Sequence, residues 1–294
     1  MEILVFGGTR FFGVYLVEKL LEKGHDVTIA TRGIAQDNFG DRVKRLVIER
    51  CDENSLSKIF KNKGYDCIVD NICYASMDVK RLLEVARCKR YVMTSTMSVY
   101  PLRNFHVNMA EEDFNPLKYP LKWYERPDAP YDEIKRQAES ALFQKFPDTK
   151  AATVRFPFVI GEEDYTRRLY FYVENVMKEM PMYINNLKAG MSFIRAKDAG
   201  AFLAWMAESK ETGSFNAANE GTVTLEQILQ YVEKKTGKKA ILAEEGKGAA
   251  APYNGTPAYS LNTQKAERKG FQFEKLDSFL PQLLDFCIEQ VKKS

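Results

Sequence analysis

The stretch ILVFGGTRFFGVYLVEKLLEKGHDVTIATRG, residues 3–33, decides the fold of this 294-residue chain. A short apolar run at 2–6 is typical of a buried strand, and residues 13–24 have the apolar period of a helix that ends at a glycine. A second apolar run follows at 25–32. Because a glycine turn joins the first run to the helix, the stretch predicts a strand, turn, helix and strand whose turn binds a dinucleotide.

The same alternation of strand and helix patterns continues along the chain. Further strands are predicted at 43–50, 66–72, 90–96, 150–157 and 213–218, and further helices at 55–64, 78–88, 130–146, 169–180, 196–210, 224–237 and 277–293. Such alternation predicts an α/β fold with a Rossmann-type doubly wound parallel sheet. We expect a dinucleotide-binding domain at 1–160 and about 193–220, with a smaller C-terminal α+β substrate lobe at about 161–192 and 221–294.

The composition is that of an ordinary globular protein. Hydrophobic residues make up 45% and charged residues 28%, and the formal net charge of +3 argues against a partner held by overall charge alone. The five cysteines include no CxxC pair, which is typical of reduced thiols. The two histidines argue against a histidine-rich metal site, and we expect no metal. The chain starts with a strand pattern and lacks a long apolar run, so we expect a cytoplasmic protein without membrane contact.

The glycine turn is expected to bind the cofactor. Glycines there permit a tight turn and let backbone amides reach a pyrophosphate at the helix N-terminus. The usual spacing places glycines at 7, 10 and 13, but Arg10 occupies the middle position. Its side chain must turn away or reach toward a phosphate, or else it blocks the site. The cofactor-binding candidates in this stretch are Gly7, Gly8, Thr9, Arg10, Phe11, Phe12 and Gly13.

The end of the second strand carries no acid. Many NAD-specific folds hold an acid there that binds the adenosine ribose hydroxyls, whereas this chain has Thr31 and Arg32. An arginine can pair bidentately with a 2′-phosphate. We therefore expect Arg32 to bind the cofactor and the chain to prefer NADP to NAD. The alternative is that Arg10 and Arg32 are solvent-exposed charges.

Asp52 follows the third predicted strand. It can accept a hydrogen bond from the adenine amino group, which makes it a further cofactor-binding candidate. It can equally cap the helix predicted after it, because aspartate is a favourable N-cap residue. The sequence leaves both roles open.

A tyrosine and a lysine four residues apart, Tyr131 and Lys135, lie on one face of the helix predicted at 130–146. A phenol with a pKa near 10 must act as acid or base near neutrality, and an adjacent ammonium lowers that pKa. The same spacing occurs at Tyr15/Lys19 and Tyr231/Lys235, so the motif alone is weak. Of the three pairs, only Tyr131/Lys135 lies at the start of the helix that follows the fifth predicted strand, beside the expected cleft.

In their order and spacing, FGGTRFFG, YVMTSTMSVY, YDEIK, VRFPFVIG and FIRAKDAGAFL resemble the extended short-chain dehydrogenase/reductase superfamily, of the NAD-dependent epimerase/dehydratase type. The resemblance implies that Tyr131 is the catalytic acid/base, that Lys135 tunes it and binds the cofactor ribose, and that Thr96 holds a substrate oxygen. It implies a strand and turn at 155–161 beside the nicotinamide and an acid, Asp198, near the substrate lobe. Asn71 and Phe156, at the ends of the fourth and sixth strands, complete the expected cofactor site.

The motif GGTRFFG resembles a branch of this superfamily that includes chloroplast stem-loop RNA-binding proteins. The leading hypothesis is an NAD(P)-dependent enzyme that transfers hydride to or from a nucleotide sugar or another small hydroxyl or carbonyl substrate. Two alternatives use the same fold: an RNA-binding protein, and an NADP-sensing regulatory module. Because related proteins often pair through helices like those predicted at 78–88 and 130–146, a homodimer is also expected.

Overall fold

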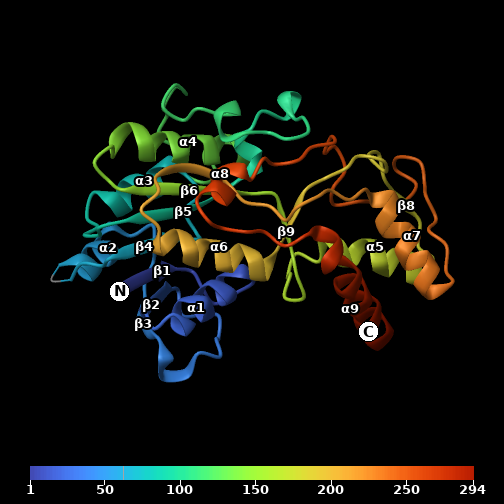
Figure 1. Cartoon of the computed structure of the whole chain (residues 1–294), viewed down its shortest axis with the longest axis horizontal. Coiled ribbons are helices and arrows are strands. Elements are labelled where there is room, and N and C mark those ends of the chain that lie inside the picture. The colour runs from blue at the N-terminus through green and yellow to red at the C-terminus, as the bar shows by residue number, and fades with distance from the viewer. Residues whose placement is uncertain (62) are drawn as a thin grey trace.

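The computed structural model describes residues 1–61 and 63–294. Its centre is a seven-stranded sheet in the order β10-β6-β5-β4-β1-β2-β3, in which every neighbouring pair is parallel (Figure 1). The strands are β1 (Glu2–Phe6), β2 (Asp26–Thr31), β3 (Lys44–Val47), β4 (Cys67–Asp70), β5 (Tyr91–Thr96), β6 (Ala151–Phe156) and β10 (Gly213–Asn216). The predicted doubly wound parallel sheet is confirmed.

Helices cover both faces of this sheet. One face carries α1 (Phe12–Glu22) and α6 (Ala196–Glu208), and the other carries α2 (Glu53–Phe60), α3 (Ser76–Leu83) and α4 (Tyr131–Lys145) (Figure 1). On the first face a hydrophobic cluster joins Val5 to Leu16 and Phe202. On the second face another cluster joins Phe6 to Leu56. Because neighbouring strand residues point to opposite sides, β1 contributes to both cores.

Some predicted elements differ at their ends. The helix predicted at 55–64 begins earlier, at Glu53, because the Asp52 carboxylate caps it by accepting from the backbone N–H of Asn54. Position 62 of that predicted helix lies outside the described residues. The strand predicted at 43–50 is limited to β3, which is four residues long.

The strand order reverses next to β1. From β1 the chain continues to β2 and β3 on one side of the sheet, and β4, β5, β6 and β10 extend the other side. In sheets of this kind ligands bind in the crevice beyond the carboxyl ends of the strands at the reversal. The carboxyl ends of β1, β2 and β4 therefore mark the position of a binding site.

A second group of elements has a hydrophobic cluster of its own, which includes Tyr172, Tyr253 and Leu283. The elements outside the main sheet are β7 (Phe158–Ile160), α5 (Arg168–Met177), β8 (Met182–Tyr183), β9 (Phe193–Arg195), α7 (Leu225–Thr236), β11 (Ala249–Ala250), α8 (Gln264–Arg268) and α9 (Leu280–Lys293). In Figure 1, α5, α7 and α9 lie together beside the sheet, whereas α8 packs against β10. We propose that the chain divides into a sheet domain and a C-terminal lobe, with α8 next to the sheet.

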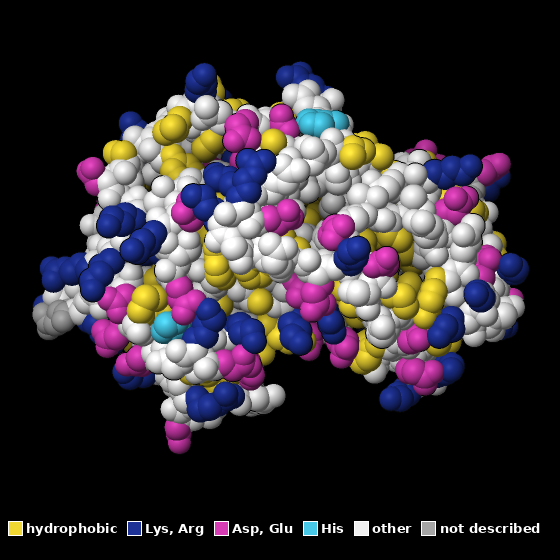
Figure 2. Space-filling view, viewed as in Figure 1, with side chains coloured by type: hydrophobic (Ala, Val, Ile, Leu, Met, Phe, Trp, Pro, Cys, Tyr) yellow, Lys and Arg dark blue, Asp and Glu magenta, His cyan; other side chains and the backbone are white. Residues whose placement is uncertain are grey.

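The surface mixes charges of both signs. Figure 2 shows Lys and Arg side chains interspersed with Asp and Glu side chains over one face of the molecule. This distribution agrees with the small net charge of +3. Within residues 1–61 and 63–294, the helices are too short or too polar to cross a lipid bilayer.

Residues 115–130, here called the strap, pack across α3 and α4. The Ser76 hydroxyl donates to the carbonyl oxygen of Lys122 at 2.8 Å. The Gln144 amide donates to the carbonyl oxygens of Pro116 and Tyr119 at 2.6 and 2.7 Å. The strap thus occupies part of the helix pair through which we expect a homodimer. The homodimer stays a prediction, and an interface through α3 and α4 would have to include the strap.

A buried ion pair fixes α4 to the sheet. Arg155 of β6 and Glu139 of α4 are both fully buried, and Arg155 Nη2 lies 2.6 Å from Glu139 Oε2. The hydroxyl of Ser95, in β5, donates to Glu139 Oε1 at 2.5 Å, and Arg155 Nη1 donates to the carbonyl oxygen of Glu111 at 2.7 Å. Burial alone would lower the pKa of Arg155, but the Glu139 carboxylate raises it above its ordinary value. The pair therefore holds the middle of α4 against the ends of β5 and β6.

We predict that Glu139→Gln lowers the free energy of unfolding by about 3–5 kcal/mol, because it leaves the Arg155 guanidinium buried without a counter-charge. The control is Glu174→Gln, which removes the carboxylate of the more exposed ion pair with Lys178 on α5. That change should cost about 0–1 kcal/mol. Urea denaturation of both variants measures the difference. Equal losses would contradict the role given to the buried pair.

Candidate functional site

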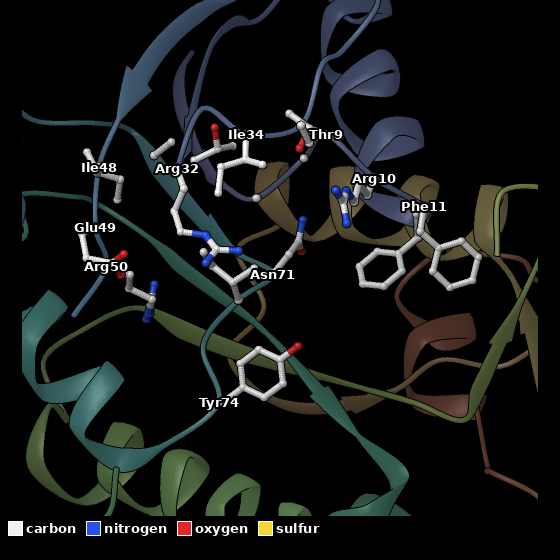
Figure 3. Close-up of a pocket in the computed structure, with 18 of the residues that line it drawn as sticks. Thr9, Arg10, Phe11, Arg32, Ile34, Ile48, Glu49, Arg50, Asn71 and Tyr74 are labelled. Atoms are coloured by element: carbon white, nitrogen blue, oxygen red, sulfur yellow. The ribbon is translucent and has the colours of Figure 1, made fainter. Parts of the chain in front are cut away.

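A cavity of about 440 Å³ lies at the carboxyl ends of β1, β2 and β4. Most of the predicted cofactor residues line it, namely Gly7, Gly8, Thr9, Arg10, Phe11, Phe12, Gly13, Arg32 and Asn71. In Figure 3, Thr9, Arg10, Arg32 and Asn71 surround the same space. The structure therefore brings together residues from three separate segments at the point where the strand order reverses.

The turn after β1 requires its glycines. Gly7 and Gly8 have φ angles of +88° and +98°, which L side chains rarely adopt. A Cβ on Gly13 would lie 2.9 Å from the Cα of Gly8, which is closer than two such atoms can approach. The turn is therefore as tight as a dinucleotide cradle demands, although Arg10 replaces the usual middle glycine.

The cradle leaves backbone donors open to a ligand. Among the described residues, the backbone N–H groups of Thr9, Arg10 and Phe11 have no protein acceptor. They precede the N-terminus of α1, where the helix dipole adds partial positive charge. The groups present thus fit a cofactor with a pyrophosphate.

Arg10 and Arg32 both face the cavity (Figure 3). Both side chains are exposed, and neither has a carboxylate partner within residues 1–61 and 63–294. Arg10 does not fill the cavity, so its side chain leaves room for a ligand. Two guanidinium groups without a carboxylate partner in the described residues give the cavity a positive potential that suits phosphate groups.

Two polar side chains, half-buried Asn71 and buried Arg50, keep buried nitrogens without a partner in the described residues. Asn71 Oδ1 accepts from the Thr94 hydroxyl at 2.8 Å, while its Nδ2 has no partner among the described residues. Arg50 is 3% exposed and pairs with Asp70 at 2.7 Å, yet its Nη1 likewise lacks a partner there. Burial alone would lower the pKa of Arg50, but the Asp70 carboxylate raises it. Such orphaned donors are costly unless a ligand or water binds them.

Glu49, rather than Asp52, lines the cavity after β3. The Asp52 carboxylate accepts from the backbone N–H of Asn54 at 3.0 Å, so its cap role describes the observed geometry. Glu49 is exposed, and Figure 3 shows it beside Arg50 and Ile48 on the far side of the site from Arg10. Sequence reasoning missed Glu49 and Arg50, because the third strand is predicted to run to residue 50, whereas β3 ends at Val47.

Lys135 is buried and firmly held. Its Nζ donates to the carbonyl oxygens of Cys73 and Thr94 at 2.7 and 2.8 Å, and only 3% of the residue is exposed. Burial lowers the pKa of Lys135 below its ordinary value. The ammonium is thus anchored between the ends of β4 and β5, one helical turn after Tyr131.

Tyr131 begins α4 directly after Pro130. Its ring is half exposed, but burial near its hydroxyl raises the pKa, while a hydrogen bond with Thr96 and the charge of Arg168 lower it in part. Thr96 ends β5, and its Oγ1 accepts from the backbone N–H of Ser98 at 3.2 Å. The structure therefore brings Tyr131 and Thr96 together. None of Thr96, Tyr131 and Lys135 is among the residues that line the 440 Å³ cavity.

Tyr74 stands between that cavity and the tyrosine–lysine pair. It lines the cavity, and its ring centroid lies 6.2 Å from that of Tyr131 in an edge-to-face arrangement. Lys135 Nζ lies 5.0 Å from the same ring centroid. Burial raises the pKa of Tyr74 above its ordinary value. Sequence reasoning did not single out Tyr74.

Arg126, from the strap, packs over Tyr74. Its guanidinium carbon lies 4.5 Å from the ring centroid. The same guanidinium donates to the carbonyl oxygen of Ile72 at 2.7 Å and to Asp78 Oδ2 at 3.2 Å. Sequence reasoning also missed Arg126, because no motif surrounds it and its partners lie about 50 residues earlier.

Phe156 and Asp198 lie outside the cavity lining. Phe156 is buried at the end of β6 and packs against Phe12, with ring centroids 5.7 Å apart. Asp198, in the first turn of α6, accepts from Asn219 at 2.7 Å, and burial raises its pKa. Phe156 thus supports the cradle from behind, and Asp198 ties α6 to the segment after β10.

The other two tyrosine–lysine pairs are engaged elsewhere. The Tyr15 hydroxyl donates to Glu163 at 2.5 Å, and the Tyr231 hydroxyl donates to Asp285 at 2.8 Å. Neither tyrosine lines the 440 Å³ cavity. Tyr131 does not line the cavity either, but it differs from the other two tyrosines in packing against Tyr74, which does line it.

Comparison with known proteins supplies the family. A model of the NAD dependent epimerase/dehydratase family matches residues 3–218. The chain is 25% identical over 253 residues to the chloroplast stem-loop binding protein of 41 kDa b of Arabidopsis thaliana, covering 80% of this chain but only 63% of that relative. It is 21% identical to dTDP-6-deoxy-L-talose 4-dehydrogenase (NAD(+)) of Aggregatibacter actinomycetemcomitans, covering 90% of this chain and 97% of that one.

Solved structures share the fold. UDP-glucose 4-epimerase of Thermotoga maritima with UDP-glucose has a TM-score of 0.76 and 19% identity, covering 100% of this chain and 99% of that one. A UDP-glucose 4-epimerase of Thermus thermophilus in complex with NAD has a TM-score of 0.71 and 17% identity, with 100% of both chains covered. Identities this low show the fold alone, but the family match spans the cradle, the cavity and α4. The chain belongs to the NAD dependent epimerase/dehydratase family and is an enzyme that depends on a nicotinamide cofactor.

Proposed function

We propose that this enzyme transfers hydride between NADP and a nucleotide sugar, with Tyr131 as the acid/base. The observation that carries the proposal is that a cofactor-binding cavity and a pair of proton-handling side chains lie next to each other. A glycine cradle with open donors faces a cavity, and the pair Tyr131 and Thr96 lies just behind the Tyr74 wall of that cavity. Groups for cofactor binding and groups for proton transfer thus lie at the same edge of the sheet.

The cavity residues divide the cofactor between them. We propose that the amides of Thr9 to Phe11 bind the pyrophosphate and that Glu49 accepts from the adenine amino group. Arg32 would pair with a 2′-phosphate, because no acid follows β2 to bind ribose hydroxyls and the guanidinium has no carboxylate partner in the described part of the chain. These assignments favour NADP over NAD.

The groups behind Tyr74 would handle the proton. When bound, the nicotinamide accepts a hydride from the substrate carbon or returns it. Tyr131, as the phenolate, takes the hydroxyl proton of the substrate while the carbonyl forms, and gives a proton back in the reverse direction. Thr96 would donate a hydrogen bond to the substrate oxygen. We propose that Lys135, held by the carbonyls of Cys73 and Thr94, would add its positive charge in favour of the phenolate, beside the charge of Arg168 that lowers the pKa of Tyr131 in this structure.

A nucleotide sugar is the proposed substrate class. The Thermotoga structure contains UDP-glucose, and the Aggregatibacter relative is named for a dTDP-sugar. In this chain Arg168 begins α5, and its guanidinium carbon lies 5.9 Å from the Phe158 ring centroid. The positive charge of Arg168 lowers the pKa of Tyr131, so this cation lies near the Tyr131 hydroxyl. We propose that Arg168 attracts the phosphates of the substrate.

A second candidate function rests on one relative. The chloroplast relative is named as a stem-loop binding protein, which keeps RNA binding as an alternative. RNA binding should weaken steeply as salt rises, because it releases counterions. Cofactor binding without turnover of any nucleotide sugar would instead favour an NADP-sensing module. Titrations with cofactor and with RNA at low and high salt separate these alternatives from an enzyme.

We predict that the wild-type chain binds NADP more tightly than NAD and that Arg32→Ala reduces this preference about 10- to 100-fold. That range corresponds to the loss of a charge-assisted hydrogen bond of about 1.5–3 kcal/mol. The matched control is Arg42→Ala, because Arg42 is exposed, faces Glu18 and does not line the cavity. Isothermal titration calorimetry measures each dissociation constant. A preference that survives Arg32→Ala would refute the assignment of Arg32.

We predict that Tyr131→Phe lowers turnover about 10²- to 10⁴-fold, because the proton loses its carrier. Cofactor affinity should change little. Tyr231→Phe is the control, since Tyr231 has the same spacing to a lysine but donates to Asp285 in the C-terminal lobe. Turnover is followed by NADPH absorbance with UDP-glucose and a dTDP-sugar as substrates. A Tyr131→Phe variant that keeps wild-type turnover would remove Tyr131 from the mechanism.

A further inference from the structure

The ring of Tyr74 covers the free side of Lys135. An ammonium has three N–H donors, and two of them go to the carbonyl oxygens of Cys73 and Thr94. The third side faces the ring of Tyr74, whose centroid lies 5.0 Å from Nζ. At that distance the ring attracts the cation. A ligand hydroxyl that is to bind Lys135 must therefore take the place of the ring.

The same ring also closes the approach to Tyr131. The two aromatic rings meet edge to face with centroids 6.2 Å apart. Tyr74 lines the cavity, whereas Tyr131, Lys135 and Thr96 do not. A ligand that fills the cavity thus reaches the glycine cradle, the arginines and Tyr74, and it stops short of the groups that would move a proton.

The neighbours of Tyr74 hold its backbone and leave its side chain able to turn. Its backbone N–H donates to Asp78 Oδ2 at 2.8 Å. The ring is only half-buried, and Arg126 covers it from the exposed strap with its guanidinium carbon 4.5 Å from the centroid. Displacing the ring therefore needs a change of side-chain rotamer and the release of Arg126, with no movement of β4.

We propose that Tyr74, held in place by Arg126, is a positioning residue that closes the catalytic edge and must turn aside before the nicotinamide half of the cofactor reaches Lys135. The inference rests on the proposed function, because it assumes a dinucleotide cofactor. It adds that the adenosine half binds to the open cavity, whereas the nicotinamide half competes with the ring of Tyr74. The apparent affinity for the whole cofactor is then reduced by the small fraction of molecules with the ring turned aside.

The test compares a whole cofactor with a fragment that ends before Tyr74. Calorimetry measures the dissociation constants of NADP⁺ and of adenosine 2′,5′-bisphosphate, which lacks the nicotinamide half. Tyr74→Ala should tighten NADP⁺ binding about tenfold, because it removes a cation–π contact and a ring contact. Binding of the fragment should stay within about twofold, since the fragment gains nothing from displacing the ring. Tyr74→Phe keeps the ring and should keep the wild-type ratio of the two constants.

Arg126→Ala gives a second, independent variant that leaves Tyr74 intact. Arg126 is 40% exposed at its side chain, so its removal should not prevent folding. It should shift the ratio of the two constants in the same direction as Tyr74→Ala, by about threefold, because the ring loses one of its two cation partners. The ratio cancels the effect of removing a positive charge from the cavity, which acts on both ligands.

The outcomes separate this inference from the proposed function. A selective gain for NADP⁺ in both variants supports the closing role of Tyr74. Equal changes for the two ligands, or weaker NADP⁺ binding in Tyr74→Ala, would overturn that role and leave the cofactor assignment standing. If wild type binds neither ligand, nor NAD⁺ and ADP as the matching pair without a 2′-phosphate, both the proposed function and this inference are wrong.

Discussion

The ion pair between Arg155 and Glu139 is the constraint on which the candidate site depends. It is fully buried, and it joins β6 to α4, while Ser95 connects it to β5. A buried pair of this kind tolerates little displacement, because either charge alone would be strongly destabilising. The middle of α4 is thereby fixed to the ends of the strands, next to the turns that carry Tyr131 and Lys135. The position of the proton-handling groups thus depends on this pair together with the hydrogen bonds of Lys135 to the carbonyl oxygens of Cys73 and Thr94.

The cradle depends on a different constraint, which is steric. A Cβ on Gly13 would lie 2.9 Å from the Cα of Gly8, and Gly8 has a φ of +98° that disfavours a side chain, so the turn requires glycine at both positions. Arg10 does not disturb this turn, because it lies between the two glycines with its side chain directed into the open space (Figure 3). The loss of the middle glycine therefore changes the charge of the cavity more than its shape. Arg32, which has no carboxylate partner among residues 1–61 and 63–294, is the physical basis for proposing NADP rather than NAD.

Periodicity and turn chemistry predict the parts of the molecule that are local in sequence. The sheet, its helices, the glycine turn and the position of Tyr131 on a helix all follow from patterns within about 15 residues. Asp52 and Glu49 show where prediction from local patterns fails. Asp52 caps α2 and Glu49, three residues earlier, lines the cavity, and only the observed end of β3 tells the two roles apart. Tyr74 and Arg126 were not predictable, since their roles come from contacts between segments far apart in the chain. The strap shows the same limit, because its hydrogen bonds join residues 116–122 to α3 and α4 without any periodic signal.

The buried ammonium of Lys135 gives a physical reason for the position of the Tyr74 ring beside Tyr131. Its ammonium is buried, and no carboxylate within the described residues pairs with it, so its charge is stabilised by two carbonyl oxygens and one aromatic face. A buried ammonium with an unsatisfied side would be costly. The ring of Tyr74 supplies the third partner, in the place that a ribose hydroxyl would take in a complex. Cofactor binding would then replace the Tyr74 ring with a ribose hydroxyl as the third partner of Lys135. The lysine would stay charged and in the same position with and without the cofactor.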